Sequence, residues 1–226
     1  MKKQPFYFEI KDIVTQFISA FDDIVISRHN RDREVESKLN VRYVYAPKQR
    51  VVHDITNKSK HIKLPVVAVS ITNVARDPGR VFNKIAGSHH PRVDELAGYD
   101  ITNTTDFLKP PVPINIGLSM SILTRYQTDM DQILSNFVPY TNPYIVISWT
   151  TPEGLLQKPQ EIRSQVLWDG NINVTYPQDL DGSSQYRVSA DVSFTIKGWL
   201  FKDQSAPEGQ IYKITSNFTP ILDIDL

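Results

Sequence analysis

The feature that most constrains the fold is a change of hydrophobic period between Pro111 and Trp149. The first part places an apolar residue at every second position, which is typical of a strand with one buried face. These residues are Ile114, Ile116, Leu118, Met120 and Ile122. After Tyr126 the apolar residues recur at helical spacing, as Met130, Ile133, Leu134, Phe137 and Val138. A second strand is predicted over 144–149, so the segment predicts strand, helix and strand.

The ends of this central helix are also predicted by the sequence. Thr128 can serve as the N-cap, and Asp129 and Asp131 then fall in the first turn. Carboxylates are favourable there because free N–H groups and the positive end of the helix dipole lie close by. Pro139 is expected to end the helix, since proline cannot continue the hydrogen-bond ladder.

The rest of the chain adds a second amphipathic helix and several strands. Apolar residues from Ile10 to Phe21 follow helical spacing, and a short strand is expected at 24–28. The polar run 29–38 predicts an exposed loop or hairpin tip. Further strands are predicted at 41–45, at 64–71 with both faces buried, at 162–176 with a turn or bulge at Asp169-Gly170, and at 188–197 with strict alternation.

These patterns predict an α+β fold in a single domain over residues 1–226. The sheet is expected to be mixed or antiparallel and flanked by two main amphipathic helices, at about 10–22 and 128–138. Residues 76–110 are rich in Gly, Pro, His, Asn and Asp, so a long irregular loop is expected there. Residues 203–226 are expected to form a C-terminal tail with a short strand at 210–214.

Composition excludes several classes of function. The 25 basic and 25 acidic residues balance, so no global attraction to nucleic acid or to an anionic membrane is expected. No apolar run approaches the length of a membrane span. The chain has no cysteine, which excludes disulfides, thiolate nucleophiles and cysteine-containing metal sites.

Recognisable catalytic chemistry is also missing from the sequence, and no metal or cofactor is expected. The chain lacks the nucleophile-elbow, phosphate-loop, dinucleotide-binding and zinc-protease motifs. The one conspicuous pair, His89-His90, lies in the irregular segment. Solvated loop histidines are the simpler interpretation, because adjacent residues of an extended chain point opposite ways and would need ligands from elsewhere.

A locally basic segment is the best candidate for contact with a partner. It begins at Arg28 and ends at Lys63. The simpler interpretation is a solvated face. The functional interpretation is contact with an acidic protein surface or with DNA phosphates. Together with two arginines of the irregular segment, the candidate residues are Arg28, Arg31, Arg33, Arg42, Lys48, Arg50, Arg76 and Arg80.

The order of several motifs resembles the tail sheath stabiliser and completion proteins, which are the tail terminators of contractile-tailed bacteriophages. The central motif runs from Leu118 to Tyr126, continues as Asp129-Met130-x-Gln132-Ile133-Leu134, and ends with Pro139-Tyr140 and Pro143. The other motifs are Phe6-Tyr7, Ile24-x-Ile26-x-Arg28, Tyr43-x-Tyr45-Ala46-x-Lys48 and the run from Phe194 to Phe201. The resemblance covers most of residues 6–202.

The resemblance implies a structural virion protein that forms a hexameric ring at the head-proximal end of the tail. Such a ring terminates and stabilises the tube and the sheath and joins the tail to the neck, beside the passing genomic DNA. A closed ring requires heterologous interfaces. Two alternatives stay open: another head–tail joining or baseplate protein, and a small enzyme or monomeric binding module that uses His89-His90.

If sheath strands are exchanged between subunits, as the resemblance suggests, an exposed sheet edge is the expected receptor. The alternating 187–197 segment and the short 210–214 segment suit an edge better than the apolar 66–71 run. The later segment is favoured, which adds Gln210, Tyr212 and Ile214 to the candidate interface residues.

Overall fold

The computed structural model describes residues 6–57, 64–81, 88–91, 105–153, 155, 159–177 and 187–202. Its main element is one six-stranded sheet with the strand order β3-β4-β7-β10-β9-β8. The strands are β3 (Arg42–Tyr45), β4 (Val66–Arg76), β7 (Val112–Thr124), β10 (Val188–Leu200), β9 (Glu161–Thr175) and β8 (Ile145–Thr150). Only β3 and β4 pair in parallel, while every other pair in this sheet is antiparallel. The expectation of an α+β fold with a mixed sheet is confirmed.

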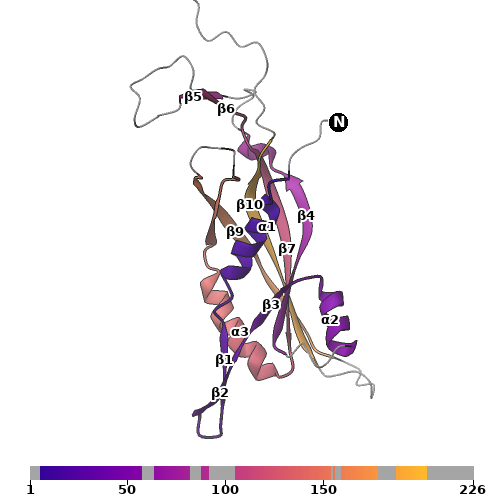
Figure 1. Cartoon of the computed structure of the whole chain (residues 1–226). Coiled ribbons are helices and arrows are strands. Elements are labelled where there is room, and N and C mark those ends of the chain that lie inside the picture. The colour runs from indigo at the N-terminus through magenta and orange to yellow at the C-terminus, as the bar shows by residue number, and fades with distance from the viewer. Residues whose placement is uncertain are drawn as a thin grey trace, which may run out of the picture.

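Within the described residues, three α-helices and a hairpin flank this sheet (Figure 1). The helices are α1 (Glu9–Ser19), α2 (Lys48–Asn57) and α3 (Gln127–Tyr140). The hairpin consists of β1 (Val25–His29) and β2 (Val35–Asn40), which pair only with each other. Figure 1 shows the hairpin and α2 toward one end of the long strands, and the short 3-10 turn η1 (Pro78–Arg80) toward the other end.

The two faces of the sheet are covered differently. Side chains of α1 and α3 share one buried cluster with the alternating residues of β7 and β10, among them Ile116, Met120 and Phe194. Helix α2 contributes Val51 and Ile55 to a second cluster on the opposite face. That cluster contains Val66 and Ala68, which alternate with Val67 and Val69 of the first cluster, as the strand period requires.

Two bulges in the six-stranded sheet adapt its strands to their neighbours. In β9 the register to β10 shifts between Trp168 and Ile172, and Gly170 adopts the left-handed φ of 82° that favours glycine. In β4 the register to β7 shifts at Thr72, and the side chains of Thr72 and Asn73 then occupy the space where a residue at Gly117 would carry its Cβ. The predicted break at Asp169-Gly170 is therefore a bulge and not a hairpin turn.

Several expectations about boundaries are wrong. Helix α3 begins at Gln127, and Tyr126 is its N-cap residue without a side-chain cap, so Thr128 lies inside the helix. Pro139 lies within the last turn, and the helix continues to Tyr140. Helix α1 ends at Ser19, so Phe21 is buried from the turn that follows the helix. Helix α2 was not predicted, because its short, polar sequence offers only Val51, Val52 and Ile55 as an apolar face.

The 187–197 segment is the clearest error in position. It forms most of β10, which lies between β7 and β9 in the middle of the sheet and is no edge strand. The expected irregular segment 76–110 is also more ordered than predicted, since its described residues include η1 and two short paired strands, β5 (Ser88–Pro91) and β6 (Thr105–Leu108). The 66–71 run begins in the centre as expected, because Val66–Val69 pair with both β3 and β7.

Helix α3 provides a matched test of packing, since Ile133 is fully buried and its neighbour Leu134 is only partly buried. We expect Ile133→Ala to lower the free energy of unfolding by ~2–5 kcal/mol, and Leu134→Ala to lower it by less. Chemical denaturation of both variants measures the difference. Equal losses for the two substitutions would contradict the packing of α3 on the sheet.

Candidate partner interface

The β1–β2 hairpin presents two of the candidate arginines at a structured tip. The side-chain oxygen of Asn30 accepts hydrogen bonds from the backbone N–H groups of Asp32 (3.0 Å) and Glu34 (2.9 Å). Arg33 has a φ of 64°, in the left-handed region that non-glycine residues rarely occupy. Arg31 and Arg33 are exposed on this tip, so the predicted hairpin tip is confirmed and the turn is fixed by local hydrogen bonds.

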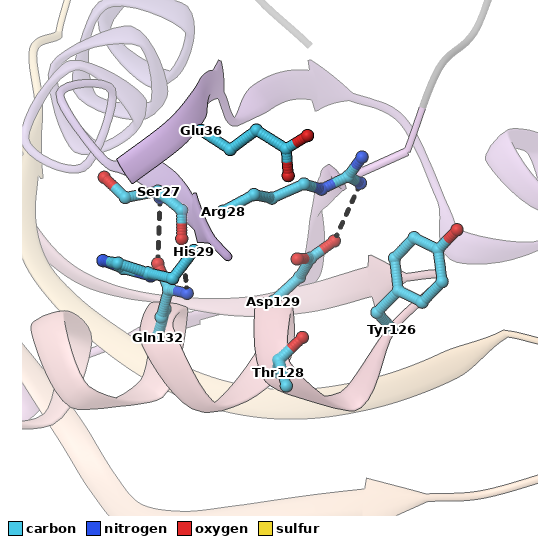
Figure 2. A pocket seen from close by; sticks show the side chains of 8 residues that line it. All are labelled: Ser27, Arg28, His29, Glu36, Tyr126, Thr128, Asp129 and Gln132. Carbon is cyan, nitrogen blue, oxygen red and sulfur yellow. Dashed lines mark hydrogen bonds and ion pairs between the residues drawn. The ribbon is translucent and has the colours of Figure 1, made fainter. Parts of the chain in front are cut away.

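Arg28 holds the tip-proximal part of strand β1 against α3. Its guanidinium lies 3.5 Å from the Asp129 carboxylate, whose side chain is only 3% exposed, and 5.1 Å from the Tyr126 ring centre. Figure 2 shows these three side chains together at one wall of a pocket of about 410 Å³. Asp129 stands in the first helical turn as predicted, but no local sequence pattern indicates that Arg28 is its partner.

Gln132 closes the free edge of the hairpin. Its side-chain oxygen accepts a hydrogen bond from the Ser27 backbone N–H at 2.9 Å, and its amide nitrogen donates to the Ser27 carbonyl at 2.8 Å (Figure 2). One glutamine thus satisfies both backbone groups of a residue in β1, as a neighbouring strand would. The hairpin edge that faces α3 is consequently not available to a partner at this position.

The second basic group lies around α2. The Lys48 ammonium group is 2.7 Å from the Asp191 carboxylate and 3.3 Å from the Ser189 hydroxyl, both on β10. Lys48 therefore fastens α2 to the sheet, and its ammonium group already has partners within the chain. Arg42 on β3 and Arg50 on α2 are exposed.

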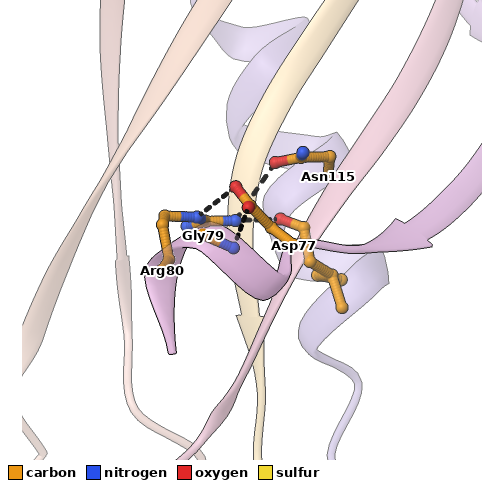
Figure 3. Close-up of polar contacts among 5 residues, drawn as sticks. Asp77, Gly79, Arg80 and Asn115 are labelled. Atoms are coloured by element: carbon orange, nitrogen blue, oxygen red, sulfur yellow. Dashed lines mark hydrogen bonds and ion pairs between the residues drawn. The ribbon is translucent and has the colours of Figure 1, made fainter. Parts of the chain in front are cut away.

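At the opposite end of the sheet, the guanidinium group of Arg80 also has partners within the chain. Its guanidinium donates to the Asp77 carboxylate (2.9 Å), to the Asn115 side chain (3.2 Å) and to the carbonyl of Ile114 (Figure 3). It also lies 4.9 Å from the Trp199 ring centre. The pKa of Asp77 is lowered from its ordinary value, mainly by the hydrogen bond from Arg80 and further by the hydrogen bond from the Gly79 N–H. Arg76 on β4 is exposed.

The predicted basic interface is therefore not one surface. Arg28, Lys48 and Arg80 are engaged within the chain, and the exposed arginines lie toward both ends of the sheet. Gln210, Tyr212 and Ile214 lie outside the described residues. His89 and His90 are consecutive residues of β5, at register positions opposite Phe107 and Asp106 of β6.

The described residues contain no group of three or more His, Cys, Asp or Glu residues that could hold a metal ion. None of the helices in these parts of the chain is long and apolar enough to cross a membrane.

Strand β8 is the candidate that sequence reasoning missed. Among the described residues it pairs with β9 on one side and with no strand on the other. The Thr151 N–H donates to the Gln160 carbonyl at 2.9 Å, next to the Thr150–Glu161 register pair. Because hydrogen-bonded pairs alternate along an antiparallel ladder, the backbone groups of Val146, Ser148 and Thr150 point to the open edge.

The composition of β8 suits it for pairing. Its sequence, IVISWT, contains no charge and no proline, which are the usual devices that protect an edge strand. Val146 is 53% exposed, and Tyr144 just before the strand is 48% exposed. By contrast, the other outer strand, β3, is four residues long and begins with Arg42. The absence of charged residues from β8 was a signal that this strand could pair with a partner. No local pattern, however, reveals which strand lies at the edge of a sheet.

A family model described as the T4-like virus Myoviridae tail sheath stabiliser matches residues 6–223. The chain belongs to this family. The Tail completion protein gp15 of Enterobacteria phage T4 is 28% identical to it over 109 residues, which are 48% of this chain and 39% of that relative. This membership confirms the resemblance seen in the sequence motifs.

A solved structure of an extracellular contractile injection system is also similar. It is described as the PVC sheath/tube terminator in its extended state, and the match covers 97% of this chain and 66% of that chain. The sequence identity is 11% and the TM-score is 0.32. The chain thus spans less than two thirds of both relatives.

The Asp77–Arg80 contact makes a prediction about pH. Since the pKa of Asp77 is lowered in the folded protein, this carboxylate stabilises the fold above its ordinary pKa of 3.8. The stabilisation is lost as the pH falls through the lower, folded-state pKa. We expect Asp77→Asn to reduce the melting temperature at neutral pH, and the difference from the wild type to shrink as the pH falls below about 4. Thermal unfolding from pH 7 to pH 2.5 measures this, and a difference that grows in acid would contradict it.

Proposed function

We propose that this chain is a structural virion protein that ends a contractile tail at its head-proximal side. In this proposal six copies form a closed ring that binds the last turn of the sheath, caps the tube and offers its other face to the neck. The observation that carries the proposal is the family match over residues 6–223. A tail sheath stabiliser must contact the sheath, and a tail completion protein acts where tail assembly stops.

The sheath contact is assigned to the open edge of β8. Strand addition derives its affinity from main-chain hydrogen bonds, and β8 offers three outward-facing residues in an uncharged strand. Its inner face is anchored, because Ile145, Ile147 and Trp149 are buried against the core that also includes α1. A rigid, pre-formed edge lowers the ordering cost of binding an incoming strand.

The exposed arginines supply further contacts in this proposal. Arg31 and Arg33 lie on a hydrogen-bonded tip that projects from the sheet, which suits them to an acidic surface of a neighbouring tail protein (Figure 1). Arg76 lies near the opposite end and would meet a different partner, such as the neck or the passing DNA. Phosphate contacts of this kind would be independent of DNA sequence.

Complementation of a phage that lacks the protein tests both the function and the edge. Ser148 is exposed, and its backbone N–H points to the open edge. Ser148→Pro removes that N–H and leaves the ladder between β8 and β9 intact, whereas Ser148→Ala removes only the hydroxyl. We expect tails without the protein to lose the sheath and stay unjoined to heads, Ser148→Ala to restore sheathed tails, and Ser148→Pro to restore few of them.

Electron micrographs of tails from infected cells give the fraction that keeps an extended sheath. Extended, head-joined tails in the absence of the protein would contradict the proposed function. Equal rescue by the proline and alanine variants would contradict the assignment of the sheath contact to the β8 edge, and would leave the proposed function standing. The circular dichroism spectra and melting temperatures of the two purified variants must agree for this comparison to count.

A further inference from the structure

Helix α1 carries an exposed aromatic pair at its amino-terminal end. Phe6 is 74% exposed and Phe8 is 51% exposed, and the two rings lie edge to face at 4.4 Å. The backbone of Phe8, with a φ of 62°, turns sharply into the helix. The buried Glu9 carboxylate next to it accepts a hydrogen bond from the Phe201 N–H at 3.1 Å, which fixes this end of α1 to the end of β10. The rings of Phe6 and Phe8 together form an exposed apolar surface, which we call the knob.

The opposite end of the same helix borders a pocket of about 410 Å³ whose lining residues are mostly apolar. Its floor is formed by Phe21 and Phe137, whose rings stack at 5.3 Å, and the Tyr140 ring meets Phe21 edge to face at 5.8 Å. Val25 and Tyr140 at the pocket are 42% and 53% exposed. Its volume falls in the range of pockets that bury small molecules, ~300–1,000 Å³, which is large enough for aromatic side chains.

One pair of opposite charges is available between the two ends, Lys11 at the first and Asp23 at the second. Lys11 lies with its ammonium group 5.7 Å from the Phe8 ring centre, next to the positive end of the α1 dipole. Asp12 stands in the same first turn, where the helix dipole offsets its charge. The pocket end has no basic residue in the last helical turn, and Asp23 lines the pocket. Lys11 of a second copy can thus pair with Asp23 at the pocket rim.

We propose that the Phe6–Phe8 knob of one copy inserts into the Phe21–Phe137–Tyr140 pocket of the next copy. Knob and pocket are different surfaces at opposite ends of one helix, so the contact is heterologous and repeats in one direction around an assembly. Lys11 of one copy then faces Asp23 of its neighbour. The inference deepens the proposed ring and rests on it, because only a closed ring gives every knob a pocket.

Two variants separate the two halves of the contact. Phe6→Ser with Phe8→Ser removes the knob, and Val25→Arg places a long side chain at the pocket mouth. Val74→Arg is the matched control for the pocket, since Val74 is 46% exposed on β4. Tyr45→Ser, at a residue that is 57% exposed on β3, is the control for the knob. Sedimentation velocity of each full-length variant over a range of concentrations gives the strength of self-association.

We expect the knob variant and the pocket variant each to associate at least about tenfold more weakly than the wild type, and both controls to associate normally. An equimolar mixture of the two defective variants should give a species of two chains and no larger one, since one good knob and one good pocket remain. Lys11→Glu and Asp23→Lys should each weaken association, and their combination in one chain should restore it.

Normal association of either defective variant, a mixture that stays monomeric, or a wild type that is monomeric at all concentrations would overturn the knob-and-pocket contact. None of these outcomes decides whether the chain ends a contractile tail, which is the core of the proposed function. That function fails separately if tails made without the protein keep their sheath and join heads.

Discussion

The fold depends on one aromatic cluster that joins α1, α3 and the central strand β10. Phe17 and Phe21 from the α1 region, Phe137 from α3 and Phe194 from β10 have ring centres 5.1–5.8 Å apart in tilted, stacked or edge-to-face pairs. Each large ring removes much apolar surface from water, and favourable ring geometry adds to that gain. Because residues from three separate parts of the chain meet there, the cluster sets the position of both helices on the sheet.

The same cluster links the core to the surfaces that we assign to assembly. Phe21 and Phe137 are buried in the core and also form the floor of the pocket at the end of α1. The hairpin is attached beside it by Gln132 and by the Arg28–Asp129 ion pair. The packing of the core thus reaches the pocket, and side-chain contacts with α3 hold the hairpin beside it.

The hydrophobic period predicted much of this architecture. It located β7, α3, β8 and β10 because each buries one face, and it identified the stripe of Met130, Ile133 and Phe137. It misplaced β10 at an edge for an understandable reason. Ser193, Thr195 and Lys197 alternate with buried residues because they occupy the sheet face that α1 and α3 do not cover. Alternation therefore reports the exposure of a face and says nothing about the position of a strand in the sheet.

Other features could not be predicted because they depend on partners distant in sequence. A first-turn aspartate such as Asp129 is sufficiently explained by the helix dipole until Arg28 is seen beside it. Lys48 and Arg80 belong to charge-rich segments that suggest a solvated or partner-facing surface, yet both bind groups of the sheet. The open edge of β8 follows only from the strand order.

We propose that copies of this chain form a closed ring where the sheath ends, at the head-proximal side of the tail. Electron cryo-microscopy of intact phage tails, with the chain fitted to the density, is the decisive measurement. We expect six copies related by rotation about the tail axis, in contact with the last sheath ring. A single copy, copies without rotational symmetry, or a position at the baseplate end would contradict it.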